Sequence, residues 1–395
     1  MNSPSKCKQI ARGLMSLVAV VPLAFANDAS AAKSGNFTYE VKDSAVTITG
    51  FPVDFKGAVA IPAKIEGKPV KKIGDYAFHY CRDVTGVAIP AGVTIIGEQA
   101  FSECNSLKNM ELPAGLVRFG LGAFAYTDLR KVKIPAGVKT ISAGAFTLCS
   151  RLKEVEIPEG VEVIEPEAFS YCSMLETLDL PASVTNVTAA SFAITDLKRI
   201  NVATGNRRYS SVDGILYNKD RTLLISCPVL KSGSVKIPAG VKRLGEKSFL
   251  RCRNLKSVEL PKGLLAIEAR AFDECNSLAQ VNLPDGVTDI GHHAFVHTPL
   301  VSVTIPASVD RIGGYAFVSC GAKSIYFKGD APSQMGTGVF DSTSKSGKPY
   351  EGRTIYFYEG AKGFTEPKWM GYDTVSLDPD TPAANRLVFG SSWPD

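Results

Sequence analysis

The cysteines are the residues whose chemistry depends most on their spacing. The chain holds 9 cysteines in 395 residues. Seven of them recur in one register, each three residues after a phenylalanine: Cys81, Cys104, Cys149, Cys172, Cys252, Cys275 and Cys320. Stacked parallel segments would place them about 4.8 Å apart, whereas the Cβ atoms of a disulfide lie about 3.8 Å apart. We therefore expect a column of buried free thiols, and no zinc site, because zinc ligands must converge on one point.

Histidines form a second cluster that could do chemistry. His292, His293 and His297 lie close in sequence, and Glu274 occupies the register of His297 one repeat earlier. A helical turn there would bring three ligands together around a metal ion. The alternative is a set of solvated surface side chains, which we favour. We accordingly expect no metal site and no cofactor.

Catalytic motifs are not evident in the sequence. The Gly-x-Ser-x-Gly motif of serine hydrolases does not occur, and neither does the His-Glu-x-x-His motif of zinc metalloproteases. Carboxylates are abundant, but their pairs follow the spacing of a repeat. We therefore expect that the protein is not an enzyme.

Two columns of exposed positions are better candidates for partner binding. One lies two residues after each phenylalanine and is apolar or aromatic in four successive repeats: Tyr126, Leu148, Tyr171 and Ile194. The other is the outward face of the strands, where Glu154, Glu156 and Asp179 form an acidic group flanked by lysine and arginine. Exposed apolar stripes and solenoid strand faces are both common partner sites. The alternatives are partial burial of the first column and a merely solvated second one.

These columns arise from a repeat of 22 or 23 residues. Its phenylalanine occurs ten times: Phe78, Phe101, Phe124, Phe146, Phe169, Phe192, Phe249, Phe272, Phe295 and Phe317. Each copy joins a short strand, a proline that ends it, a second extended piece, and an Ala-Phe-x-x-Cys segment expected to form one helical turn. In every third copy threonine replaces the cysteine and one residue is lost, which gives a unit of 68 residues. No copy can bury its apolar face alone, so the copies must stack.

The pattern predicts an α/β repeat fold: a right-handed leucine-rich-repeat solenoid with a parallel β-sheet and short helical turns, capped at both ends. We expect one continuous sheet through all copies. The expected divisions are 1–26 signal peptide, 36–60 cap hairpin, 61–202 repeats one to six, 203–236 an inserted and projecting β-hairpin, 237–327 repeats seven to ten, 328–375 a degenerate terminal repeat, and 376–395 a mobile tail.

The N-terminal residues are typical of an export signal. Lys6, Lys8 and Arg12 precede an apolar run over residues 14–25, and small residues offer cleavage after Ala26 or near residue 31. This run is too short to span a bilayer, and no longer one follows, so we expect no membrane span. Removing residues 1–26 lowers the formal charge from +5 to +2, because three bases and no acids are lost. That small charge argues against nucleic-acid binding.

The consensus of Ile-Pro or Leu-Pro, Ile-Gly and Ala-Phe-x-x-Cys-x-x-Leu resembles the BspA-like, or Treponema-type, leucine-rich repeats of bacterial surface proteins. The resemblance covers about residues 36–375. It implies a secreted, cell-surface or periplasmic protein, since members of that family are described as adhesins or host-matrix binders. We therefore expect binding of a protein or glycan ligand through an extended face. The alternative is a structural or self-associating envelope component. The sequence leaves the ligand and the oligomeric state open.

Overall fold

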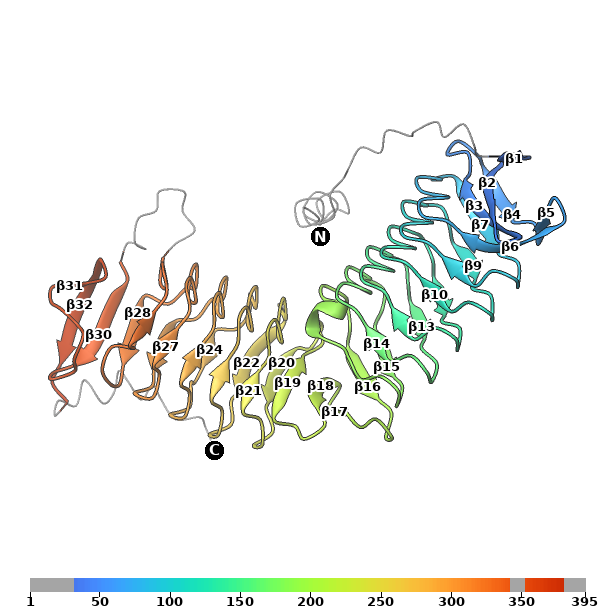
Figure 1. Ribbon diagram of the computed structural model, residues 1–395. Coiled ribbons are helices and arrows are strands. Elements are labelled where there is room, and N and C mark those ends of the chain that lie inside the picture. Colours follow the sequence, from blue (N-terminus) through green and yellow to red (C-terminus); the bar gives the residue numbers. More distant parts are fainter. Residues whose placement is uncertain (1–31, 342–351, 380–395) are drawn as a thin grey trace.

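The computed structural model describes residues 32–341 and 352–379. The expected signal peptide and residues 380–395 of the expected tail lie outside these ranges. The described residues wind into stacked coils that form one elongated solenoid (Figure 1). The stack bends in its middle, so that an N-terminal arm and a C-terminal arm meet at an angle (Figure 1).

One side of the coils, here named the A face, carries a strand from each coil. Successive strands pair in parallel and in register, in groups of two to four. The A-face strands are β4 (Gly57–Ala60), β7 (Val84–Ala88), β9 (Asn109–Glu111), β11 (Lys131–Lys133), β13 (Glu154–Glu156), β15 (Thr177–Leu180), β16 (Arg199–Val202), β20 (Gly233–Lys236), β22 (Leu255–Glu259), β24 (Gln280–Val281), β26 (Ser302–Ile305), β28 (Ser324–Phe327), β30 (Thr354–Tyr358) and β32 (Tyr372–Leu377).

A second side, the B face, carries another strand from most coils, which in the regular repeats is a two-residue strand after the proline. The B-face strands are β3 (Ala45–Gly50), β6 (Lys68–Ile73), β8 (Ile95–Ile96), β10 (Arg118–Phe119), β12 (Thr140–Ile141), β14 (Val163–Ile164), β19 (Leu223–Ser226), β21 (Arg243–Leu244), β23 (Ala266–Ile267), β25 (Asp289–Ile290), β27 (Arg311–Ile312) and β29 (Gln334–Met335). The expectation of one continuous sheet is therefore wrong. Each coil supplies two strands to two faces, and the pairing on each face is interrupted.

Antiparallel pairing occurs at the ends and in the middle of the described chain. At the N-terminal end, β1 (Ala32–Ser34) and β2 (Phe37–Lys42) extend the sheet from β3, and β5 (Lys64–Ile65) pairs with β6. At the other end β31 (Lys368–Trp369) pairs with β32. In the middle, β17 (Tyr209–Val212), β18 (Ile215–Asn218) and β19 form two consecutive hairpins.

The third side, the turn face, holds the Ala-Phe segment of each coil. The Phe78 N–H donates to the carbonyl of Ala100 in the next coil at 2.8 Å, and the Phe101 N–H donates to Ala123 at 2.8 Å. The residues two before and two after the phenylalanine have left-handed backbones, as at Glu103 with φ 61°. An α-helix would instead direct these N–H groups to carbonyls four residues back. The expected helical turns are therefore not found in most coils. The exception is the sixth repeat, where the 3-10 turn η1 (Ala189–Phe192) ends on the repeat phenylalanine and is the one helix among the described residues.

Phenylalanine rings stack along the centre of each arm. In the N-terminal arm the rings from Phe51 to Phe169 have neighbouring centroids 4.9 to 5.9 Å apart. In the C-terminal arm the rings from Phe249 to Phe340 have centroids 4.8 to 5.6 Å apart. The buried apolar side chains accordingly form two clusters, which meet at Ile215 and Leu216. We name this junction, residues 192–249, the seam.

The two central hairpins fill the seam, so the expectation of a projecting insertion is wrong. The Ile200 N–H in β16 donates to the Gly214 carbonyl at the β17–β18 turn, at 2.9 Å. On the opposite side β19 pairs in parallel with β21 and starts the B-face sheet of the C-terminal arm. The hairpins therefore connect the two arms through backbone hydrogen bonds on both sides.

Arg353 closes the core at the C-terminal end. Its side chain is 1% exposed. The guanidinium donates to the carbonyls of Ala322 at 2.8 Å, Cys320 at 2.9 Å and Phe340. In earlier coils the phenylalanine carbonyl accepts a hydrogen bond from the cysteine of the next coil. Phe340 is the last ring of the phenylalanine stack, and there Arg353 takes that role.

We expect the substitution Arg353→Met to destabilise the C-terminal arm by about 2–3 kcal/mol, because it leaves buried carbonyls without donors. Chemical denaturation followed by the fluorescence of Trp369 would measure the loss. Arg353→Lys, which keeps the charge but not the planar fork of donors, should recover only part of it. Equal stability of wild type and both variants would contradict the capping role.

Candidate ligand-binding face

Charged side chains line the A face where the two arms meet. We name the following set the charged strip: Lys131, Lys133, Glu154, Glu156, Glu176, Asp179, Lys198, Arg199 and Asn201. Parallel in-register pairing sets Lys131 beside Glu154 and Lys133 beside Glu156. The same pairing sets Asp179 beside Asn201. The acidic group expected from the sequence is therefore a contiguous feature of the A face.

Lysine side chains neutralise the acidic residues at one end of the strip. The Lys131 Nζ lies 2.8 Å from Glu154 Oε1 and 2.6 Å from Glu156 Oε1, and the Lys133 Nζ lies 3.4 Å from Glu156 Oε2. The hydrogen bond from Lys131 holds the pKa of the Glu156 carboxyl below its usual value. Exposed pairs of this kind contribute little to stability, because water screens them. They do hold the side chains in fixed positions on the surface.

The other end of the strip leaves a cation without an acidic partner. The Lys198 Nζ lies 2.8 Å from Glu176, and the Asn201 amide donates to Asp179 at 2.7 Å. Arg199 is exposed, and no carboxylate of the described residues lies within ion-pair distance of it. The strip therefore ends at the seam in an uncompensated positive charge.

A polar hollow of about 510 Å³ opens directly beside Arg199. Its lining comprises Arg199, Asn201, Val202, Ser211, Asp213, Gly214 and Lys231. It forms because no A-face strand lies between β16 and β20, and the β17–β18 turn occupies the space between them. The volume lies within the range of about 300–1,000 Å³ that is usual for small-molecule sites.

The floor of the hollow depends on a tight turn. Asp213 and Gly214 form a two-residue loop with φ values of 50° and 78°, and both positive values are typical of a type I′ hairpin turn. A Cβ atom on Gly214 would lie 2.8 Å from the Cβ of Arg199, so glycine is required by this close approach. The hollow was not predicted from the sequence, although the Asp213-Gly214 dipeptide is a recognised signal for a two-residue hairpin turn.

The apolar column expected as a partner site is only half exposed. Tyr126, Leu148, Tyr171 and Ile194 all lie on the turn face with intermediate exposure. All four have left-handed backbones, with φ from 59° to 61°. The N–H groups of Tyr126, Leu148 and Tyr171 donate to the next coil, as from Leu148 to Ser170 at 2.8 Å. The four residues do follow one another from coil to coil, but they form a shallow stripe and not a raised apolar surface.

Cysteine thiols form a buried column behind the turn face. All eight cysteines of the described residues are buried and free, including Cys227, which lies outside the register expected from the sequence. The Cys104 thiol donates to the Phe78 carbonyl at 3.1 Å and the Cys149 thiol to Phe124 at 3.2 Å. Burial raises the pKa of Cys81 to about 12 and that of Cys149 to about 11. These thiols are therefore protonated structural donors and not nucleophiles.

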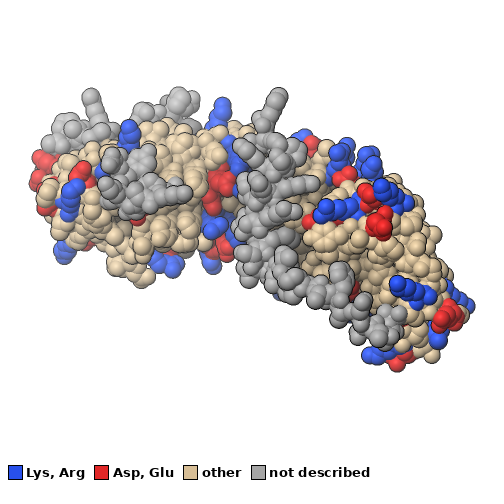
Figure 2. Space-filling view, turned by 90° about the horizontal axis from the view of Figure 1, so that it is seen from above, with Lys and Arg blue, Asp and Glu red and all other residues tan. Residues whose placement is uncertain are grey.

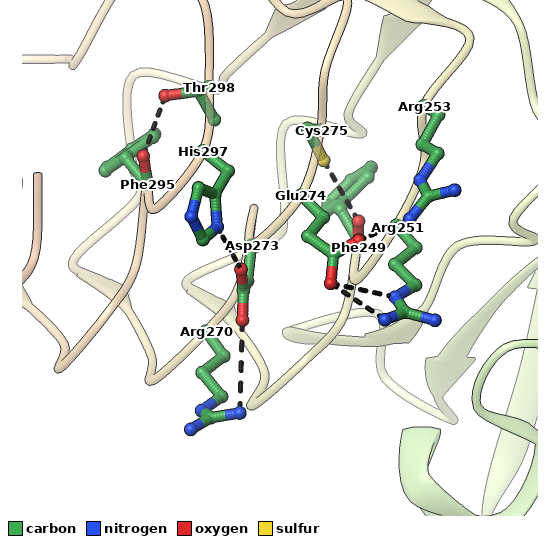
Figure 3. A network of polar contacts seen from close by, with 10 residues as sticks. All are labelled: Phe249, Arg251, Arg253, Arg270, Asp273, Glu274, Cys275, Phe295, His297 and Thr298. Atoms are coloured by element: carbon green, nitrogen blue, oxygen red, sulfur yellow. Dashed lines mark hydrogen bonds and ion pairs between the residues drawn. The ribbon is translucent and has the colours of Figure 1, made fainter. Parts of the chain in front are cut away.

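The histidine cluster is not arranged as a metal site. Glu274 is held by the guanidinium groups of Arg251 and Arg253, with the Arg251 Nη2 at 2.9 Å, and His297 Nδ1 instead lies 3.9 Å from Asp273 (Figure 3). No group of three or more potential ligands converges anywhere in residues 32–341 and 352–379. Burial lowers the pKa of His293 to about 4. The solvated alternative thus describes His297, while His293 packs against Tyr315.

Acidic and basic side chains intermingle on the face of the molecule seen in Figure 2, and the coloured atoms form no large area of one charge. The A face at the seam differs, since its charges are ordered along one strip that ends in a hollow. The described part of the chain contains no helix of the length and apolarity that crossing a bilayer demands.

The repeats match a known family of leucine-rich repeats. A family model described as the BspA type leucine-rich-repeat region matches six copies over residues 71–201 and 227–346, which is more than half of the chain. The chain belongs to the BspA-type leucine-rich-repeat family. The gap between the two matched ranges falls on the central hairpins. A search of curated proteins gives no significant match.

Solved structures of leucine-rich-repeat proteins share this fold. The pneumococcal vaccine antigen PcpA is 23% identical, with a TM-score of 0.72 over 88% of this chain and 99% of its own. A leucine-rich cell surface protein of Faecalibacterium prausnitzii is 26% identical, with a TM-score of 0.62 over 80% of this chain and 95% of its own. The BspA-type chain is thus similar to surface and antigen proteins built from the same stacked coils.

Proposed function

We propose that this BspA-type protein is exported to the cell surface or beyond and binds a protein or glycan ligand there, without catalysis. The proposal places the ligand on the charged strip and in the seam hollow. The observation that carries it is the interruption of the A face at β16, which leaves a polar hollow at the end of an ordered row of charges. Concave sites with a few convergent polar groups are the usual places for ligands.

The charged strip is preferred to the apolar column of the turn face. Tyr126 and Tyr171 are half-buried, so a partner would gain little apolar contact area there. The strip instead presents exposed charges, such as Glu154 and Asp179, whose neighbours fix their positions. Preorganised polar groups bind with a smaller loss of side-chain entropy.

The test is a binding screen with the natively folded chain against immobilised extracellular-matrix proteins and a glycan array. Each ligand captured by the wild type is then offered to the double variant Glu154→Lys with Asp179→Lys. We expect capture to weaken by at least about tenfold, which corresponds to about 1.4 kcal/mol. A matched control, Glu40→Lys with Asp310→Lys, makes the same charge change at exposed positions far from the strip.

Three results would contradict the proposal. The first is capture that both double variants leave unchanged. The second is capture that only Tyr126→Ser with Tyr171→Ser abolishes while the fold is retained, which would move the site to the turn face. The third is a wild type that captures nothing but assembles with itself in sedimentation velocity, which would favour a structural envelope component.

A further inference from the structure

Positive charge is concentrated at the seam although the whole chain is close to neutral. The seam, residues 192–249, contains eleven Lys and Arg against four Asp and Glu, a formal charge of +7. The preceding stretch, residues 151–191, contains two Lys and Arg against eight Asp and Glu, a formal charge of −6. The chain total of +5 therefore hides a strong local asymmetry. A local field of this kind attracts anions to the basic side of the junction.

Many of these cations are already paired, but those at the hollow are not. Lys236 lies 2.6 Å from Glu259, and Lys198 lies 2.8 Å from Glu176. In the hollow, by contrast, Arg199 has no carboxylate within ion-pair distance among the described residues, and Lys231 donates only to the backbone carbonyl of Asp213, at 2.7 Å. A backbone carbonyl does not neutralise an ammonium charge. The hollow therefore offers two cations with donors still unused.

The same lining also offers hydrogen-bond acceptors. Asp213 supplies a carboxylate at the exposed tip of the turn, and the Ser211 hydroxyl donates to the Ile200 carbonyl at 2.6 Å, which leaves its lone pairs able to accept. Asn201 adds an amide. No aromatic side chain lines the hollow. Recognition there would rest on charge and directed hydrogen bonds, and not on stacking.

We infer that the seam hollow binds a uronic-acid unit of an acidic polysaccharide; this rests on the proposed function and names its ligand class. The sugar carboxylate pairs with Arg199, whose planar fork of donors matches a carboxylate, and with Lys231. The ring hydroxyls donate to Asp213 and Ser211. A simple inorganic anion would use the cations but leave the Asp213 carboxylate facing it, which is unfavourable. A uronic acid can pair its carboxylate with the two cations and its hydroxyl groups with the Asp213 carboxylate.

The surroundings fit a polymer better than a free sugar. The hollow is open to solvent, so a bound unit can continue into a chain on either side. Lys256 is exposed on β22, which pairs with β20 close to Lys231. Lys256 is in no ion pair within the described ranges. It would contact a neighbouring acidic unit through a screened charge interaction.

The test is isothermal titration of the full chain with an oligogalacturonate at physiological salt. We expect the double variant Arg199→Gln with Lys231→Gln to bind at least about tenfold more weakly, because two charged contacts are lost. Asn201→Leu, which leaves the charge unchanged, should also weaken binding several-fold. The matched control Arg118→Gln with Lys64→Gln removes one Arg and one Lys from exposed sites on the N-terminal arm and should bind within about twofold of the wild type.

Four outcomes would overturn this inference. Equal weakening in the hollow and control variants would show a diffuse charge effect. A maltooligosaccharide bound as tightly as the oligogalacturonate would show that the acid is not recognised. Tighter binding of inorganic phosphate than of oligogalacturonate would mark a simple anion site. If no oligogalacturonate binds, the ligand class is wrong, and the separate screen on matrix proteins and glycans still decides whether the protein binds anything on its charged strip.

Discussion

Raising the pH from 8 to 10 is expected to destabilise both arms. Burial raises the thiol pKa above its ordinary value of 9.0 in Cys81, Cys104, Cys149, Cys172, Cys275 and Cys320, and the contact with Cys227 together with burial raises the pKa of Cys252. At pH 10 these groups are therefore more fully protonated in the folded protein than in the unfolded chain. Their contribution is therefore complete below pH 9 and is lost as the pH rises through the folded pKa values. A thiol whose folded pKa lies well above 10 costs roughly 1 kcal/mol of stability at pH 10, and several such thiols together cost a substantial part of the usual stability of a domain.

Urea denaturation at a series of pH values would measure this loss. Buried tyrosines such as Tyr217 also have raised pKa values, so a control must isolate the thiols. The repeat itself supplies one, because Thr127 and Thr298 occupy the cysteine position in other coils. The double variant Cys104→Thr with Cys172→Thr should lose about 2 kcal/mol less between pH 8 and pH 10 than the wild type does. An identical pH dependence in the two proteins would show that the thiol column is not the cause.

Phe169→Ala is expected to destabilise the N-terminal arm by about 3–5 kcal/mol. Phe169 is 0% exposed, and its ring stacks on Phe146 with centroids 5.6 Å apart. Truncation opens a cavity in a core that cannot collapse, because the backbone of each coil is tied to its neighbours. The ring stack stops at the seam, so the C-terminal arm should lose much less stability.

Hydrogen exchange read by mass spectrometry would follow the two arms separately, and Trp369 gives a second signal for the C-terminal arm once Trp393 is replaced by Phe. Phe272→Ala is the mirror variant, since Phe272 is 0% exposed and stacks on Phe249 at 4.8 Å. It should loosen the C-terminal arm and spare the other. Equal loss in both arms from either variant would mean that the two clusters unfold as one unit.

The periodic residues made the solenoid predictable. A phenylalanine every 22 or 23 residues requires stacked coils, and burial of that ring and of the nearby cysteine follows from the same argument. The helical turn was wrong for most coils because the segment satisfies its N–H groups between coils. Glu103 and Leu148 have left-handed backbones although neither residue is a glycine, so the residue type gives no sign of this conformation. Local propensity alone could not reveal contacts that form only between neighbouring copies.

The candidate site was predictable in part, for a related reason. The charges of Glu154, Glu156 and Asp179 could be placed on an outward face, because strand residues alternate between the two sides. The hollow could not be predicted, because Arg199 and Lys231 are brought to the same site only by the way the two hairpins fold back between the arms. The Asp213-Gly214 turn was readable locally, but the residue against which it packs was not. Long-range placement of an irregular segment requires the three-dimensional structure.

The arginine that closes the last coil has a consequence for how such proteins change in size. The Arg353 guanidinium donates to carbonyls of the final coils, and the hairpins of the seam hydrogen-bond to the coils beside them. A duplicated block of 68 residues inserted within either arm would meet the same neighbours above and below it. Each such block would lengthen the molecule by about 14 Å without altering its recognition site or its terminus. The length of the solenoid and the ligand specificity of its recognition site can therefore evolve independently.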